Sequence, residues 1–322
     1  MFKVISRICV TLLIMGSLAA CNEVTRISLT SDSGDYIGAG KSYSYNNSDA
    51  LITVTADGGL LEVHIDGDER WSGNFQLPDG YDDIQPGSYG ELTRYPFHDP
   101  TVGGLSWSGE GRGCNTLDGW FIVEFANYNE QGELQSVKLN FEQHCEGQVA
   151  ALKGDITWHA NDVTLPAGPI DPAPEGLWEP DPDAAPIEGN AVYLSSGMDD
   201  FVGLGSNYLY ADGVEPLSVT EKDGLITVRI DGWSGDFKPM DFLDSMEPGY
   251  YGDLMRYPFN NPVKGGLSWT GKGRGCNRSN GWFVVDSIQY EAEVLTQVEI
   301  RFEQYCDSST APLAGYIRWS AP

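Results

Sequence analysis

The sequence predicts an all-β protein built from two tandem antiparallel β-sandwich domains of jelly-roll type, each with one disulfide. Three observations support this fold class. The 322 residues include 39 glycines, 18 prolines, 9 tryptophans, 16 tyrosines and 12 phenylalanines, a composition typical of short strands joined by tight turns. Segments of apolar–polar alternation recur along the chain, whereas long amphipathic helical patterns are rare. Finally, one domain-sized pattern occurs twice.

The N-terminus has the order of residues typical of a secretory signal. Lys3 and Arg7 precede an apolar run over residues 8–15 that is too short to span a bilayer, and Leu-Ala-Ala-Cys follows at residues 18–21. This ending resembles a bacterial lipobox, which implies that residues 1–21 are a lipoprotein signal and that Cys21 carries the lipid. The alternative is an ordinary signal peptide with a chance cysteine. Asn22 favours the outer membrane by the same resemblance.

The repeat defines the domain organisation. Residues 86–125 and 248–287 are identical at 25 of 40 positions without a gap, and looser similarity extends to both sides. We therefore expect one domain over 22–159 and a second over 190–322. Residues 160–189 are rich in proline and acidic residues and repeat nothing, so we expect an extended linker that joins separable domains.

Individual strands are clearest near the end of each repeat. Residues 137–145 alternate apolar and polar side chains, and residues 298–306 do the same, which predicts half-buried strands with Gln143 and Cys145 on the core face. The turn-forming segment 128–135 should pair the first of these strands with residues 120–125 in a hairpin. Similar runs at 51–56, 60–66, 71–76 and 154–158 bring the expected number to about eight strands per domain.

Four cysteines remain after Cys9, which leaves with the signal, and Cys21. Two of them fall in each repeat, and an exported chain with an even number favours disulfides. The simplest of the three connectivities is Cys114–Cys145 with Cys276–Cys306. Zinc is the alternative, but no two of these cysteines have the C-x-x-C spacing.

The most distinctive repeated phrase is Gly-Arg-Gly-Cys-Asn, at residues 111–115 and 273–277. Its glycines, cysteine and asparagine suit turns and a disulfide, so the arginines are the informative members. Arg112 and Arg274 could grip a ligand carboxylate or sugar hydroxyls. We favour the alternative of an internal ion pair, with Glu142 and Glu303 as the partners.

Eight of the nine tryptophans form repeated pairs, at 71/233, 107/269, 120/282 and 158/319. The first interpretation of a tryptophan repeated at matching positions is that it packs in the core. However, Trp120 and Trp282 each precede a phenylalanine, and two neighbours on one strand cannot both face inward. We therefore expect one indole of this kind on the outer face of each domain, where it could stack on a sugar or contact a partner protein.

The repeat argues against a duplicated catalytic centre. The four histidines do not recur at the matching positions, and no Ser-His-Asp or Cys-His arrangement survives in both halves. A carboxylate pair in one half alone remains the alternative. Asp66, Asp68 and Glu69 resemble part of a calcium loop, although they lack the full EF-hand spacing and the second copy has lost two of them. We expect no cofactor, with calcium at this loop as the alternative.

The net charge of −28, from 47 acidic and 19 basic residues, excludes nucleic acid and anionic lipid as favoured partners.

Several phrases together resemble a known module. These are Arg-Tyr-Pro-Phe, Gly-Leu-Ser-Trp, Gly-x-Gly-Arg-Gly-Cys-Asn, Gly-Trp-Phe, Phe-Glu-Gln-His-Cys-Glu-Gly and a closing Leu-x-Gly. They are similar to an uncharacterised β-sandwich module of exported bacterial proteins, and they cover most of both repeats. The second copy departs at Tyr305 and Asp307. The resemblance implies export and fold, and it implies no activity.

These observations predict a lipoprotein of the cell outer membrane, attached through its lipid anchor, with a non-catalytic binding or structural role. The expected partner is a glycan or an envelope protein. The alternative is a carbohydrate-active hydrolase in which one copy is degenerate.

Overall fold

The computed structural model describes residues 24–183, 188–211 and 216–322. These ranges contain twenty strands in two similar domains, and no helix within them has the length and apolar character needed to span a bilayer. Domain 1 holds β1 (Arg26–Ser31), β2 (Ser42–Tyr45), β3 (Leu51–Asp57), β4 (Leu60–Asp66), β5 (Arg70–Gln76), β6 (Gly87–Arg94), β7 (Gly104–Gly109), β8 (Leu117–Tyr128), β9 (Leu134–Cys145) and β10 (Ala151–His159). Domain 2 holds β11 (Ala191–Ser196), β12 (Asn207–Ala211), β13 (Ser218–Lys222), β14 (Leu225–Ile230), β15 (Trp233–Lys238), β16 (Gly249–Arg256), β17 (Gly266–Gly271), β18 (Ser279–Glu291), β19 (Val294–Cys306) and β20 (Pro312–Ser320).

The ten strands of each domain form one continuous sheet. The order in domain 1 is β2-β1-β10-β9-β8-β6-β7-β5-β4-β3, and domain 2 repeats it. Neighbouring strands are antiparallel except for β6–β7 and β16–β17, which pair in parallel over two residues each. The all-β prediction is confirmed. The sequence predicted about eight strands because short strands such as β2, with four residues, carry too little alternation to be recognised.

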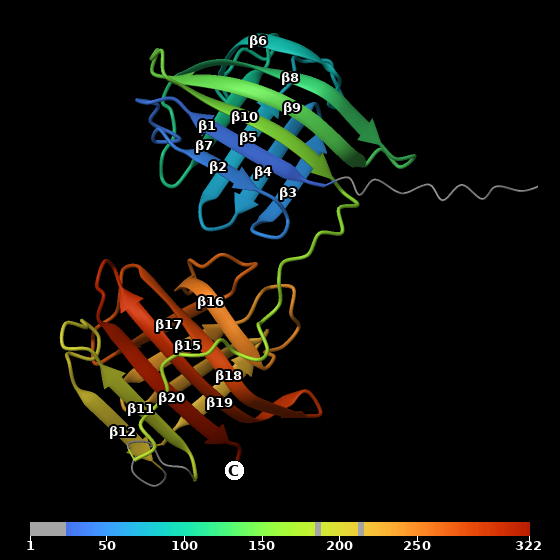
Figure 1. Ribbon diagram of the computed structural model, residues 1–322. Helices are drawn as coiled ribbons and strands as arrows, with labels where there is room; N and C mark the ends of the chain where they lie inside the picture. Colours follow the sequence, from blue (N-terminus) through green and yellow to red (C-terminus); the bar gives the residue numbers. More distant parts are fainter. Residues whose placement is uncertain (1–23, 184–187, 212–215) are drawn as a thin grey trace, which may run out of the picture.

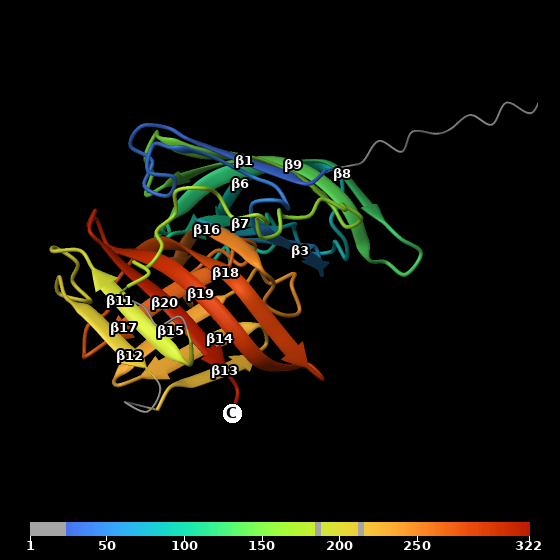
Figure 2. The ribbon, with the colours of Figure 1, turned by 60° about the horizontal axis from the view of Figure 1, so that its bottom comes forward.

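Each sheet curls over until its two edge regions meet (Figures 1 and 2). The edge strands β2 and β3 are joined by residues 46–50 alone, and Tyr43 on β2 packs edge-on against Trp71 on β5 with ring centroids 5.0 Å apart. The inner face of the curled sheet therefore packs against itself, which gives the two layers that a sandwich requires.

The core consists of aromatic rings from opposite sides of the curl. Phe75 on β5 contacts Phe121 on β8 and Phe141 on β9 with centroids 5.5 and 5.3 Å apart, and all three side chains are buried. Gly73 leaves room for Trp107, because a Cβ there would lie 2.4 Å from the indole ring. Domain 2 repeats this cluster with Phe237, Phe283, Phe302 and Trp269.

Both predicted disulfides are present, Cys114–Cys145 and Cys276–Cys306. Beside the first, the buried amide of Gln143 accepts a hydrogen bond from the Trp107 backbone N–H and donates one to its C=O, both at 2.8 Å. Gln304 does the same for Trp269. The amide therefore joins β7 to β9, two strands that are not neighbours in the sheet, and satisfies backbone groups that burial would otherwise leave unpaired.

The segment between the domains is docked on domain 2, although we expected an extended linker. Residues 165–180, called the strap below, cross the outer face of the second sheet (Figure 1). Ile170 exchanges two backbone hydrogen bonds with Tyr250 on β16, at 3.0 and 2.9 Å. Further along, the carbonyl of Trp178 accepts a bond from Arg301 on β19, and the Trp178 indole stacks on Tyr193 of β11. Ile170 thus joins the sheet between prolines 169 and 172, because it keeps the N–H that proline lacks.

Candidate functional site

The repeated arginines hold a loop of their own domain. The Arg112 Nε–H donates a 2.7 Å hydrogen bond to the carbonyl of Ile37, and its guanidinium lies 5.8 Å from the Trp71 ring. Arg274 donates to Val202 at the same distance and lies over Trp233. The ion pairs expected with Glu142 and Glu303 are not formed. Those carboxylates contact other residues: Glu142 contacts His144, and Glu303 accepts from Trp282 and Tyr305.

The loop that Arg112 holds is organised from within by a buried carboxylate. Asp35 accepts hydrogen bonds from the Ser31 hydroxyl and from the backbone N–H groups of Ile37 and Gly38, at 2.6, 3.2 and 2.8 Å. Asp200 repeats this pattern in domain 2. The loop, residues 32–40, lies between β1 and β2, so the arginine fixes the edge of the sheet at the point where the curl closes.

An aromatic cluster completes this closure. The Trp71 indole N–H donates to the Tyr45 hydroxyl at 2.7 Å, and that hydroxyl donates to Glu69 at 2.9 Å. Burial raises the pKa of Tyr45, so the phenol stays protonated as a donor. Domain 2 repeats the chain with Trp233, Tyr210 and Asp231. Every member of the cluster has a structural partner, which gives Arg112 and Arg274 a role in holding the fold.

Trp120 and Trp282 both lie on the outer face of their sheets, as the alternation predicts, while Phe121 and Phe283 are fully buried inside. Their surroundings differ. Trp120 is half-buried, whereas Trp282 is buried, with 8% of its surface exposed. The expectation of an exposed indole in each domain is therefore wrong for domain 2. There the Tyr250 ring lies 6.1 Å from the Trp282 ring, and the strap crosses the same face of the sheet (Figure 1).

The two outer faces have diverged around these indoles. In domain 2 the outward residues include Tyr193, Ala314 and Tyr316, all buried. The residues at the matching positions of domain 1 are Ser28, Lys153 and Asp155, which are half-buried or exposed. Tyr250, which pairs with the strap, is replaced by the exposed Ser88. The outer face of domain 2 is therefore apolar and carries the strap, whereas the outer face of domain 1 is more polar around Trp120.

The three carboxylates considered for calcium do not converge. Asp66 pairs with Arg70 at 2.7 Å, and Glu69 accepts from Tyr45. Asp68 reaches across to domain 2, where it contacts Lys264 at 2.8 Å and Asn261 at 3.0 Å. No cluster of three metal-ligating side chains occurs within the described ranges. The acidic loop therefore serves as a contact between the domains.

The interface between the domains is formed by the acidic loop, residues 66–69 of domain 1, and the loop at residues 260–264 of domain 2. Asn261 is buried, with 1% exposed, and its amide donates to the Asp49 carbonyl as well as to Asp68. Arg70 donates to the Asn260 carbonyl at 3.2 Å. Asn261 replaces Asp99 of the first copy, so the buried donor exists only where the domains meet.

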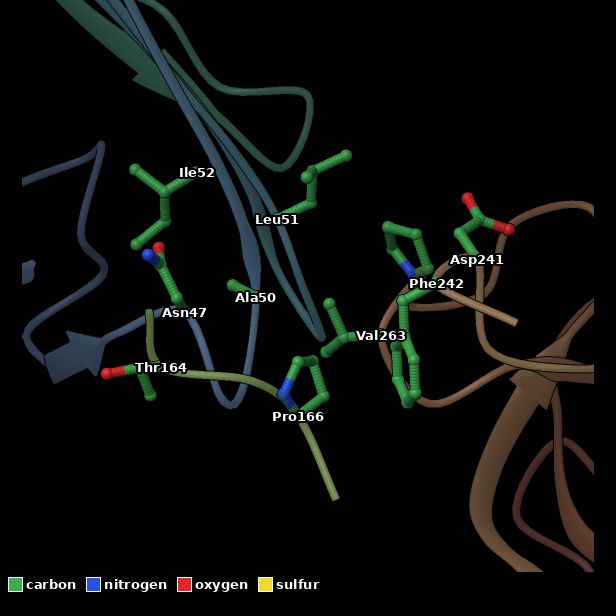
Figure 3. A pocket seen from close by; sticks show the side chains of 10 residues that line it. Asn47, Ala50, Leu51, Ile52, Thr164, Pro166, Asp241, Phe242 and Val263 are labelled. Atoms are coloured by element: carbon green, nitrogen blue, oxygen red, sulfur yellow. The ribbon is translucent and has the colours of Figure 1, made fainter. Parts of the chain in front are cut away.

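An apolar groove lies beside this interface, with a volume of about 320 Å³. Figure 3 shows Leu51 and Ile52 of domain 1 on one side and Phe242 and Val263 of domain 2 on the other, with Pro166 of the strap between them. Leu51 and Phe242 keep 49% and 41% of their surface exposed. The groove therefore leaves large apolar side chains from both domains in contact with solvent.

Domain 2 contains a second, more polar cavity of about 550 Å³ with several carboxylates in its wall, among them Glu221, Asp223, Asp244 and Glu293. The Tyr290 hydroxyl donates to Glu221 at 3.3 Å. Burial raises the pKa of Glu221. Ala56 stands at the matching place in β3, so the first copy lacks this carboxylate.

Sequence reasoning missed the strap contacts and the groove. One signal for the strap was present, since Trp178 is the tryptophan without a counterpart and lies in a proline-rich segment. The groove had no such signal, because its residues come from four separate segments, at 47–52, 164–166, 241–242 and 262–263. Cys21 and the signal segment lie outside the described residues.

Comparison with known proteins adds little. No family model and no curated protein matches the chain. A solved structure from Nostoc punctiforme, a protein of unknown function from the DUF3598 family, aligns over 93% of this chain and 94% of its own, with 10% sequence identity and a TM-score of 0.16. A score this low carries no argument about fold or function.

Proposed function

We propose that this protein is a non-catalytic binding lipoprotein, anchored in the outer membrane through Cys21, whose domain 1 captures an extended segment of a partner protein on its outer face. The anchor rests on the lipobox-like residues 18–21. The binding role rests on one observation, which is that the same face of domain 2 carries an extended segment of this chain.

Domain 2 supplies the pattern for this binding. Ile170 adds one antiparallel bridge to β16 at Tyr250, on the side away from β18. Among the described residues, β17 joins β16 on that side only further along, at Met255 and Arg256. The strap then crosses β19 and reaches β11. Addition of an extended peptide to a free strand edge is a common mode of recognition, in which backbone bonds supply affinity and neighbouring side chains supply specificity.

Domain 1 offers the same edge without a strap. Ser88 pairs with Ile122 in the register in which Tyr250 pairs with Val284. Within the described ranges no segment bridges to Ser88, as Ile170 bridges to Tyr250. Trp120 and Ile122 lie next to this edge on β8, both half-buried. An unpaired edge beside an accessible indole is a template for an incoming strand.

The experiment uses the chain beginning at Asn22, arrays of extended peptides and of glycans, and two variants. Ser88→Pro removes the edge N–H at a place where proline is tolerated, and Trp120→Ala removes the indole. We expect peptide binding to weaken about tenfold or more in both variants, because each loses a hydrogen bond or an aromatic contact from the interface. Phe97→Ala, at an exposed phenylalanine of the 95–98 turn, is the matched control.

Binding of glycans that depends on Trp120 and not on Ser88 would assign the face to sugars and overturn the peptide proposal. No binding on either array would overturn the binding role.

A carbohydrate-active hydrolase is the second candidate, favoured by the carboxylate cavity that only domain 2 has. A carboxyl with a raised pKa beside other carboxylates is the arrangement that a glycosidase uses. Release of reducing ends from envelope glycans by the wild type, lost in Glu221→Gln, would establish this activity. Equal release by both proteins, or none, would remove it.

A further inference from the structure

We propose that the apolar groove between the domains holds one acyl chain of the protein's own lipid anchor. This inference rests on the proposed lipidation of Cys21 and extends it, since it assigns a place to part of the lipid. The groove belongs neither to the outer face of domain 1 nor to the carboxylate cavity.

The position of the chain's first described residues supports this occupant. The Thr25 backbone N–H donates a 2.7 Å hydrogen bond to Asp162. The same carboxylate accepts from the Asn47 amide at 3.1 Å and from the Thr164 backbone N–H at 2.9 Å. Asn47 and Thr164 are both lining residues of the groove. The point at which the chain enters domain 1 is therefore one side chain away from the groove wall, and Figure 1 shows β1 beginning beside the start of the linker.

The reach of the anchor is sufficient. Cys21 lies four residues before Thr25, so their separation is at most about 14 Å even in a fully extended chain. An acyl chain attached at this distance is tethered next to the groove. Tethering raises its effective concentration there far above that of a free lipid.

The chemistry of the walls fits an acyl chain. Leu51, Phe242, Pro166 and Val263 supply an apolar lining from both domains and the strap. The charge of −28 disfavours a second, surface contact with anionic lipid, whereas an uncharged hydrocarbon chain meets no such repulsion. A lipoprotein with several acyl chains can place one in the groove and remain anchored, because two chains in the bilayer hold stably where one does not.

The probe for this site is an uncharged fluorescent long-chain alcohol, titrated below the concentration at which it forms micelles into the unlipidated chain beginning at Asn22. We expect saturable binding of one probe per chain. Leu51→Glu and Phe242→Glu should each weaken it about tenfold or more, because each removes apolar surface that the probe would bury. Both side chains are about half exposed, so the variants should fold, and unchanged melting checks this. Phe97→Glu is the matched control at an exposed site away from the groove.

The second measurement identifies the occupant. Protein purified from membranes with its lipid attached should take up much less probe than the unlipidated chain. Equal uptake by lipidated and unlipidated protein would overturn the proposal while leaving the anchor intact, and so would probe binding that the two groove variants do not change. Mass spectrometry of the N-terminal peptide reports the anchor separately, since an unmodified Cys21 would refute lipidation itself.

Discussion

At the scale of single residues, the guanidinium groups of Arg112 and Arg274 show how one side chain can serve a fold by bonding to backbone. Each donates to a carbonyl of the 32–40 loop or its counterpart and lies over a buried indole. A hydrogen bond from a charged donor contributes about 1.5–3 kcal/mol, and a cation–π contact about 0.5–1 kcal/mol at a partly exposed site.

We therefore expect Arg112→Ala or Arg274→Ala to lower the free energy of unfolding by about 2 kcal/mol, from loss of the carbonyl bond and the indole contact. Urea unfolding followed by tryptophan fluorescence measures this change. Arg26→Ala, at an exposed arginine on β1, is the control and should be near neutral. If the two arginine variants unfold like the control, the loop is held by other contacts.

A second residue-scale prediction concerns Glu221, whose pKa is raised by burial. The folded state then binds this proton more tightly than the unfolded state, so ionisation destabilises the fold. Glu221→Gln should be more stable than the wild type at pH 7. This advantage should shrink as the pH falls and vanish below about pH 4, near the pKa of an unperturbed glutamate. Thermal melts of both proteins from pH 3 to 8 test the prediction, and an advantage that persists at pH 3 would contradict it.

Several residue assignments could be predicted from sequence because two copies constrain each other. The disulfides, the inward Gln143 and the outward Trp120 all follow from alternation and duplication. The partner of Arg112 could not be predicted, because Ile37 contributes a backbone carbonyl and every residue type has one. Charge complementarity suggested Glu142 because it considers only side chains as partners and leaves backbone carbonyls out.

At the scale of elements, the strap belongs to domain 2, because it packs on the outer face of that domain's sheet. Truncation to residues 190–322 would uncover Tyr193, Trp282 and Tyr316, which are each 8% exposed in the intact chain. We expect this fragment to melt at a lower temperature and to self-associate, since a large apolar patch on a sheet becomes exposed. A fragment of residues 165–322 should remain monomeric and unfold cooperatively. Sedimentation and calorimetry compare the two, and equal behaviour would mean that the strap contributes nothing to stability.

The disulfides act on the element scale as well, since each ties the loop after β7 or β17 to the end of β9 or β19. The closed loops span 31 and 30 residues. In the chain-entropy description a loop of this length contributes about 3–4 kcal/mol. Cys276→Ala with Cys306→Ala should therefore destabilise domain 2 by an amount of this order, measured by denaturant unfolding. The same pair of changes at Cys114 and Cys145 should affect domain 1, and an effect below about 1 kcal/mol in both would show that the loops are already ordered in the unfolded chain.

At the scale of the whole molecule, the orientation of the domains depends on one buried amide more than on the ion pair beside it. Asn261 is buried and donates twice across the interface, whereas Lys264 pairs with a half-exposed Asp68. We expect Asn261→Ala to broaden the distribution of distances between spin labels placed one in each domain. Lys264→Ala should leave it nearly unchanged, because an exposed ion pair contributes less than about 1 kcal/mol. The reverse ranking would contradict this account.

The position of the strap in the chain has a consequence for biogenesis. Because residues 165–180 precede β11, they are made before any strand of domain 2. The aromatic face of the second sheet can therefore meet its cover as soon as it forms, and it need not wait for a later part of the chain. A permuted protein with the same strap at its C-terminus would reach the same contacts only after synthesis of the whole sheet, with that face open to aggregation in the meantime. The strap is therefore in place to cover an aromatic face of the domain that follows it from the start of folding.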